Sequence, residues 1–388
     1  MAATDSDLVE PFHLSIPETE LEDLQRRLQN TRWPDREPVN DWSQGVPLAK
    51  VQELCEYWRD TYDWRRCEAM LNNWNQYHTT IDGVKVHFLH IRSPEPDALP
   101  MIMTHGWPGS VLEFNKVIGL LTDPVAHGGR AVDAFHLILP SLPGYGFSRK
   151  PTETGWGFVR IANAWGILME RLGYHHYVAQ GGDWGADVTA SFASNPPSGL
   201  AAVHLSTAFF NAKHEIRGQP SAAESKAAEM QQLFEMDEYG YFKIQGTRPQ
   251  TVGYGLADSP AGQAAWIYEK ISKWSQHSGD VESILSKDEI LDNIMLYWLP
   301  NAATSSARQY WENEDNTALP IKIPIGVSLF PGDQYYATRT WGERYYENII
   351  HWKDVEKGGH FAAWEVPEIF VREVRDCFRS IHHAKESK

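Results

Sequence analysis

The feature of this sequence that most constrains its fold is an alternation of short apolar runs with longer helical segments. The apolar runs have the length and composition of buried strands, and they cover residues 99–104, 135–140, 177–180, 201–205 and 323–329. Several segments between them, such as residues 157–172, have helical length and period. This alternation predicts an α/β fold, with a mostly parallel sheet and helices on both of its faces.

The start of this pattern and one interruption of it predict the domain organisation. Residues 79–88 indicate a hairpin with Asp82 and Gly83 at its turn, since this pair tolerates positive φ. Between about residues 211 and 315 the pattern becomes helical and rich in Tyr and Trp, which predicts an inserted helical lid. We therefore expect the core to occupy residues 79–210 and 316–388, on either side of the lid at 211–315. Residues 366–381, with Pro367 near the first turn, predict a closing helix.

The first 78 residues have helical patterns that three prolines interrupt (Pro34, Pro38 and Pro47), and they are rich in tryptophan. Large apolar side chains beside prolines indicate a segment that packs over another domain and does not fold alone. We expect residues 1–78 to form an N-terminal helical meander that wraps the core.

Charge and composition restrict the partners. A net charge of −16 repels nucleic acid and anionic membranes, so neither is expected as a partner. The sequence has no signal-peptide pattern and no run of 18 apolar residues, which predicts a soluble, cytoplasmic protein that does not bind membranes. Its three cysteines lack metal-binding spacing. A small-molecule ligand is the expected partner, and the oligomeric state stays open, with a homodimer as the assembly we consider.

The strongest local motif is Gly181-Gly182-Asp183-Trp184-Gly185, which follows one apolar run and precedes a helical stretch at 186–193. It has the form of the nucleophile elbow of α/β-hydrolases, with a carboxylate where esterases have serine. The tight turn requires small neighbours and leaves the side chain at a helix N-terminus, which stabilises negative charge. Asp183 could equally be a helix N-cap if the motif stood alone.

Two later segments favour the catalytic interpretation of Asp183. Asp333 follows the apolar run at 323–329, and His360 lies in a glycine-rich loop before the last predicted helix. Nucleophile, acid and histidine occur in this order in α/β-hydrolases. Other acidic residues share the stretch with Asp333, but we favour Asp333 because it ends a strand; these residues are Glu343, Glu347, Asp354 and Glu356.

A carboxylate nucleophile narrows the chemistry. It attacks a saturated electrophilic carbon and forms an ester with the enzyme, which water activated by the histidine then hydrolyses. The oxyanion that forms on Asp183 needs two backbone N–H donors. We expect one from Trp184, directly after the nucleophile, and the other from Trp107 in the loop His105-Gly106-Trp107-Pro108-Gly109.

These motifs resemble those of epoxide hydrolases, specifically the microsomal-type branch. The similarity rests on residues 105–110, 140–148, 181–185 and 358–361, on Leu28–Pro34 near the N-terminus, and on a lid stretch from residue 244 to 274. It covers nearly the whole chain. Two differences stand out: the membrane-anchoring helix of the animal enzymes is missing, and the charge-relay Glu of those enzymes is matched here by Asp333. The resemblance implies a soluble, bacterial-type relative that hydrolyses apolar epoxides to diols.

In that family two lid tyrosines donate hydrogen bonds to the departing alkoxide. The lid contains six tyrosines among which physical reasoning does not choose: Tyr239, Tyr241, Tyr254, Tyr268, Tyr297 and Tyr310. The family pattern selects Tyr241 and Tyr310. With Trp107 and Trp184, these tyrosines are the expected substrate-binding residues. No metal or organic cofactor is implied.

Four alternatives remain at this stage. A haloalkane dehalogenase shares the Asp nucleophile and often a Trp directly after it, but the paired lid tyrosines favour an epoxide. A fluoroacetate dehalogenase would need an arginine within residues 186–193, where none occurs. A non-catalytic receptor on the same fold would not need the complete set of catalytic groups. A serine esterase is disfavoured because the elbow carries Asp183.

Overall fold

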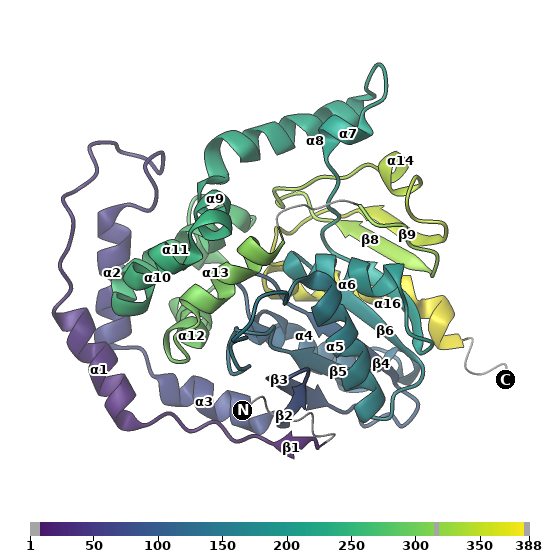
Figure 1. Ribbon diagram of the computed structural model, residues 1–388, viewed down its shortest axis with the longest axis horizontal. Coiled ribbons are helices and arrows are strands. Elements are labelled where there is room, and N and C mark those ends of the chain that lie inside the picture. Colours follow the sequence, from purple (N-terminus) through teal and green to yellow (C-terminus); the bar gives the residue numbers. More distant parts are fainter. Residues whose placement is uncertain (1–7, 314–317, 384–388) are drawn as a thin grey trace.

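The computed structural model describes residues 8–313 and 318–383, and its centre is a nine-stranded sheet (Figure 1). The strand order is β1-β2-β3-β5-β4-β6-β7-β8-β9. The pairs from β1 to β5 along this order are antiparallel, and those from β5 to β9 are parallel. The predicted α/β fold with a mostly parallel sheet is therefore confirmed. The strands are β1 (Glu10–Pro11), β2 (Gln76–Ile81), β3 (Val84–Ile91), β4 (Leu99–Thr104), β5 (Phe135–Pro140), β6 (Tyr177–Gly181), β7 (Leu200–Leu205), β8 (Ile325–Leu329) and β9 (Ile349–Asp354).

Helices cover both faces of this sheet. On one face α5 (Phe158–Arg171) packs against α6 (Trp184–Ser194), and on the other α4 (Asn115–Thr122) packs against α16 (Pro367–His383) (Figure 1). The short helices α14 (Arg339–Gly342) and α15 (Ala362–Glu365) follow β8 and precede α16. The strands between these layers are buried almost completely, as in β4, where all six residues are buried. Continuous apolar runs mark such strands because both of their faces are covered.

A helical segment separates β7 from β8 in the chain. Its helices α9 to α13 gather into one group beside the sheet, and α1 (Glu18–Gln29) and α2 (Leu48–Asp60) lie along the outer side of this group (Figure 1). The N-terminal segment therefore packs against these helices, and α3 (Trp64–Asn73) leads from it to β2. The intervening helices are α7 (Ala212–Glu215), α8 (Ala222–Leu233), α9 (Gly240–Thr247), α10 (Pro249–Asp258), α11 (Pro260–Trp274), α12 (Lys287–Trp298) and α13 (Ala303–Glu312). The lid boundary expected at residues 315 and 316, and the outer ends of the first and last segments, lie outside the described residues.

Two strands were not predicted. β1 is only two residues long and contains Pro11, which cannot donate a ladder hydrogen bond. β9 is an edge strand in which no residue is fully buried, so its sequence lacks the apolar run that marks the central strands. Both strands form by pairing with a neighbouring strand, and their own sequences lack the pattern that predicts a buried strand. Within the described residues, no helix combines the length and apolarity that crossing a membrane requires.

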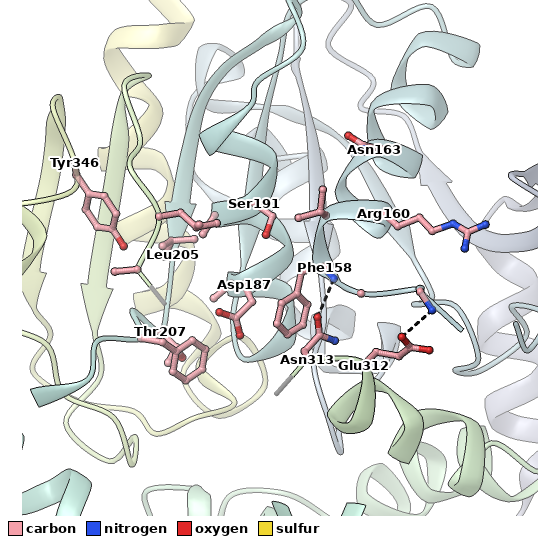
Figure 2. A pocket seen from close by; sticks show the side chains of 18 residues that line it. Phe158, Arg160, Asn163, Asp187, Ser191, Leu205, Thr207, Glu312, Asn313 and Tyr346 are labelled. Carbon is pink, nitrogen blue, oxygen red and sulfur yellow. Dashed lines mark hydrogen bonds between the residues drawn. The ribbon is translucent and has the colours of Figure 1, made fainter. Parts of the chain in front are cut away.

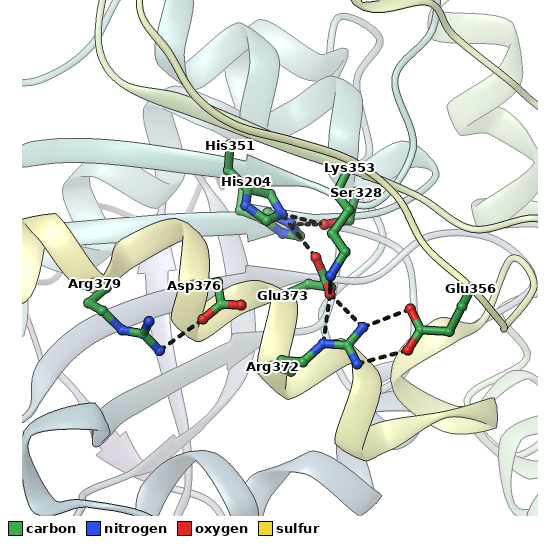
Figure 3. A network of polar contacts seen from close by, with 9 residues as sticks. All are labelled: His204, Ser328, His351, Lys353, Glu356, Arg372, Glu373, Asp376 and Arg379. Carbon is green, nitrogen blue, oxygen red and sulfur yellow. Dashed lines mark hydrogen bonds and ion pairs between the residues drawn. The ribbon is translucent and has the colours of Figure 1, made fainter.

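A polar network joins α16 to the edge of the sheet (Figure 3). At its centre the fully buried carboxylate of Glu373 contacts His351 at 3.0 Å, Lys353 at 3.0 Å and Arg372 at 2.7 Å. Burial by itself raises the pKa of Glu373, but the hydrogen bonds from these three side chains outweigh it and lower the pKa to about 2. The ionised carboxylate therefore stabilises the folded protein.

We expect Glu373→Gln to lower the free energy of unfolding at neutral pH by on the order of 2 kcal/mol, less than for a fully buried pair because two of its cationic partners stay partly hydrated. A folded-state pKa below the unfolded value means that this contribution is present above about pH 4.5 and is lost as pH falls toward 2. Urea unfolding of both proteins at pH 7 and at pH 3 measures the difference. An equal gap at the two pH values would contradict this account.

Candidate active site

The turn between β6 and α6 places Asp183 at the carboxyl end of the sheet. Asp183 has φ 49° and ψ −132°, a conformation that costs a non-glycine residue on the order of 1–3 kcal/mol. Its neighbours must be glycines: a Cβ at Gly181 would overlap the Gly185 carbonyl, and a Cβ at Gly185 would overlap the Thr104 carbonyl. The close passage of three backbone segments thus raises one carboxylate above the sheet, as the motif predicts.

The structure brings His360 and Asp333 to this carboxylate from two later loops. His360 Nδ1 lies 2.9 Å from Asp333 Oδ1, and His360 Nε2 lies 3.3 Å from Asp183 Oδ2. Asp333 also accepts a hydrogen bond from the Thr207 hydroxyl at 2.9 Å and one from the Gln334 amide at 2.7 Å. The imidazole therefore bridges two carboxylates, of which Asp333 is buried and held by further hydrogen bonds.

The charge state of His360 follows from these contacts. Burial by itself lowers the pKa of an imidazole, but the charges of Asp333 and Asp183 and their hydrogen bonds to His360 outweigh it and raise this pKa well above its ordinary value. A protonated His360 pairs with an ionised Asp183. If Asp183 lost its charge, one of the two groups that favour the imidazolium would disappear, the pKa of His360 would fall, and the neutral imidazole that can accept a proton would be favoured.

A partly buried glutamate that was not predicted organises the loop of His360. The carboxylate of Glu365 accepts hydrogen bonds from the amides of both neighbours of the histidine, Gly359 and Phe361, each at 2.9 Å. It also accepts one at 2.7 Å from the amide of Gln276, just after α11. Burial raises the pKa of Glu365 to about 7 despite these hydrogen bonds. One carboxylate thus joins the histidine loop to the end of α11.

The loop after β4 supplies a hydrogen bond to the carboxylate. The backbone N–H of Trp107 donates to Asp183 Oδ1 at 2.8 Å. Trp184 is the first residue of α6, where an N–H has no partner within its own helix. Two side chains of α12 hold the loop in place: Asn293 donates to the Pro108 carbonyl and Tyr297 to the Gly109 carbonyl, both at 2.7 Å.

Tyr241 of α9 and Tyr310 of α13 meet above the carboxylate. The two side chains are hydrogen-bonded to each other, and both are buried. The Tyr241 ring stacks on Trp107 with centroids 5.0 Å apart, and the Tyr310 ring lies 4.5 Å from Trp184. Burial raises the pKa of both hydroxyls well above their ordinary value, so they stay protonated and can donate.

The other lid tyrosines have different surroundings. Tyr254 is 72% exposed, Tyr268 donates to Glu282, and Tyr297 binds the loop of Trp107. Tyr268 thus forms a side-chain hydrogen bond, and Tyr297 forms one to the backbone of that loop. The pairing of Tyr241 with Tyr310 arises from three-dimensional contacts between helices that are far apart in sequence.

A large cavity lies elsewhere, beside α5 and α6 (Figure 2). Its volume is about 590 Å³, and none of the predicted site residues lines it. Figure 2 shows two hydrogen bonds across its edge, from the Gly155 amide to Glu312 at 2.8 Å and from the Phe158 amide to Asn313 at 3.0 Å. These contacts fix the end of α13 to the core, and therefore fix Tyr310 two residues earlier.

A much smaller cavity adjoins the predicted site. It offers about 20 Å³ to the centre of a water molecule, and Asp183 and His360 both line it. Glu113 and Gln180, which sequence reasoning did not select, line it as well. Gln180 lies only three residues before Asp183, and this proximity is the one sequence feature that could have identified it. Glu113 has no such feature.

Comparisons with known proteins identify the family and the fold of this chain. Residues 9–114 match the family described as "Epoxide hydrolase N terminus", and residues 100–244 match the family described as "alpha/beta hydrolase fold". The chain is 56% identical over 375 residues to a protein of Stigmatella aurantiaca (strain DW4/3-1) whose name assigns it provisionally to the epoxide hydrolases; the alignment covers 96% of this chain and 85% of that protein. Epoxide hydrolase 1 of Sus scrofa is 34% identical over 407 residues, with 96% and 89% covered.

Two solved structures share the fold over almost the full length. The juvenile hormone epoxide hydrolase of the silkworm Bombyx mori superimposes with a TM-score of 0.89 at 29% identity, covering 98% of this chain and 96% of that one. The Aspergillus niger epoxide hydrolase superimposes with a TM-score of 0.86 at 30% identity, covering 98% and 97%. The arrangement that places Asp183, His360 and the two tyrosines is thus built on a scaffold that these proteins share.

Proposed function

Since the chain belongs to the epoxide hydrolases, we propose that it converts an apolar epoxide to a vicinal diol through an ester on Asp183. The observation that supports this most directly is the position of two protonated tyrosines, Tyr241 and Tyr310, whose rings contact Trp107 and Trp184 beside the carboxylate. A carboxylate on one side and two hydroxyl donors on the other suit an epoxide, which needs a nucleophile at carbon and a proton at oxygen.

In the first step Asp183 Oδ2 attacks an epoxide carbon. We assign the attack to Oδ2, whose contact with His360 Nε2 at 3.3 Å is longer than the 2.8 Å hydrogen bond from the Trp107 amide to Oδ1. The new bond joins Oδ2 to carbon, the ring C–O bond breaks, and the departing oxygen takes the proton of a tyrosine hydroxyl. Esterification removes the negative charge of Asp183, so the pKa of His360 falls, its proton is released, and the tyrosinate takes one up.

In the second step His360 accepts a proton from water, whose oxygen forms a bond to the ester carbon of Asp183. The resulting oxyanion is stabilised by the amides of Trp107 and Trp184. Its collapse breaks the bond between the ester carbon and the alkyl oxygen, which leaves as the diol with a proton from His360. The acid proton remaining on Asp183 returns to His360, and the initial ion pair is restored. Asp333 holds the imidazole in the orientation for these transfers.

Two measurements test the proposal. Styrene oxide and a bromoalkane are incubated separately with the enzyme, and diol and bromide are quantified; bromide without diol would favour a dehalogenase. A single turnover in heavy-oxygen water, with enzyme in excess, then locates the label. The ester mechanism places the heavy oxygen in the Asp183 carboxylate, whereas direct attack of water on the epoxide places it in the diol.

Removing a tyrosine hydroxyl should slow ring opening. We expect Tyr241→Phe and Tyr310→Phe each to lower the rate constant of ester formation by about 10²-fold, as the loss of one oxyanion donor does. Stopped-flow tryptophan fluorescence measures that step, since Trp107 and Trp184 adjoin the site. Tyr254→Phe is the matched control, because this lid tyrosine is 72% exposed. Unchanged ester formation in both buried variants would mean that other groups protonate the alkoxide.

A further inference from the structure

The small cavity beside Asp183 has the size of one water molecule. A buried water needs about 10–15 Å³ for its centre and two to four polar partners. The cavity offers about 20 Å³. Its apolar lining is formed by Phe114, Phe361, Ala362, Ala363 and Phe370. It is also lined by the polar groups Glu113, Gln180, Asp183, Ser206 and His360.

One of these polar groups is an acceptor that lacks a donor. Gln180 is 1% exposed, and its Oε1 has no hydrogen-bond partner among the described residues. Its Nε2 is 3.5 Å from the Ser206 hydroxyl, so the amide is oriented on that side only. An unpaired buried carbonyl costs about 1–3 kcal/mol, and such groups are usually paired with an ordered water. Gln180 Oε1 therefore suits a water in this cavity.

Glu113 provides a second acceptor in the same space. Its carboxyl group interacts with the backbone of Gly106 and lies against Gly109, where an added Cβ would overlap it. Gly106 in turn touches the Asp183 side chain so closely that a Cβ there would overlap it. The carboxyl of Glu113 is therefore held next to the nucleophile, although the motifs around residues 181 and 360 do not include it.

We propose that Gln180 and Glu113 bind the hydrolytic water in this cavity and present it to the ester carbon of Asp183 and to His360. The inference rests on the ester mechanism of the proposed function and adds the water-binding groups. The water donates one hydrogen to His360 and directs the other to Gln180 Oε1 or to the Glu113 carboxyl. Burial raises the pKa of Glu113 to about 8, so at neutral pH its neutral carboxyl group offers the water a carbonyl oxygen as acceptor.

The test separates ester formation from ester hydrolysis in two variants. Gln180→Met and Glu113→Met each keep roughly the side-chain volume and remove the acceptor. We expect ester formation within about twofold of wild type and ester hydrolysis slowed by about tenfold or more, so that kcat and KM fall together. Stopped-flow fluorescence gives both rate constants, and intact mass of the quenched steady state shows the accumulated ester.

Gln263→Met is the matched control. Gln263 is also 1% exposed and has an unpaired Oε1, but it lies on α11 and does not line the cavity. The Gln263→Met variant should therefore not accumulate the Asp183 ester. Wild-type hydrolysis in either cavity variant would remove that residue as a water ligand, and equal slowing of both steps would overturn the inference. If His360→Gln also accumulated no adduct, the ester mechanism itself would fail. The two failures are thus distinguishable.

Discussion

Replacing Asp183 by glycine is expected to abolish diol formation while leaving the fold intact. The variant loses the nucleophile, and removal of a catalytic nucleophile typically lowers kcat by about 10⁵-fold or more. Glycine is the best replacement for this test because position 183 has φ 49°, which glycine adopts without strain. The relief of strain offsets the lost contact with His360, so we expect a free energy of unfolding within about 1 kcal/mol of wild type or above it.

Two assays measure this result. Chiral chromatography of the diol from a racemic epoxide gives the activity, and urea unfolding followed by fluorescence gives the stability. Asp183→Ala is the matched control, since it also lacks the carboxylate but retains the strain at φ 49°. We expect it to be equally inactive and less stable than the glycine variant. Residual turnover above about 1% of wild type in either protein would assign the nucleophile to another group.

The parts of the site that the sequence predicted are those set by local geometry. The elbow around Asp183 is one tight turn, and its glycines are needed because neighbouring backbone lies within contact distance of them. Five consecutive residues therefore suffice to identify it in the sequence. His360 lies in a loop of the same kind, and Asp333 follows the apolar strand β8. Their order along the chain, together with a parallel sheet, places all three at one edge.

The unpredicted parts depend on contacts between distant segments. Glu113 lies against the Gly106–Gly109 loop, and Asn293 holds that loop from α12, 185 residues away from Pro108. Glu365 is a partly buried acid in a helical stretch, and only the structure shows that it binds the amides on either side of His360. Burial and orientation decide these roles, and neither is encoded in a short motif.

The strands also divide into those that the local sequence predicts and those that depend on contacts with distant segments. The central strands have continuous apolar runs because both of their faces are covered, and this pattern predicted them. The edge strand β9 has no fully buried residue, and only pairing with β8 identifies it. The polar network of Glu373 then joins this edge to α16. The sequence therefore predicts the centre of the sheet and the catalytic edge better than the periphery.

Replacing His360 by glutamine should separate the two half-reactions and trap the ester. Asp183 keeps its carboxylate and its hydrogen bond from the Trp107 amide, so ester formation continues. Ester hydrolysis loses its general base, which typically costs on the order of 10²- to 10⁴-fold. We expect one enzyme equivalent of epoxide to be consumed in a burst, with almost no further diol. Intact mass should then rise by the mass of the epoxide, and peptide mapping should place the adduct on the peptide that contains Asp183.

The double variant Asp183→Gly, His360→Gln is the control that identifies the site of attachment. It retains the tyrosines and the lid but has no carboxylate at position 183, so it should gain no mass under the same conditions. An adduct on the double variant would mean that the epoxide alkylates another nucleophile. If the single variant gained no mass while the wild type still formed diol, water would have to attack the epoxide directly. His360 would then act on the water in the only chemical step, and a carboxylate strained at φ 49° would have an electrostatic role alone.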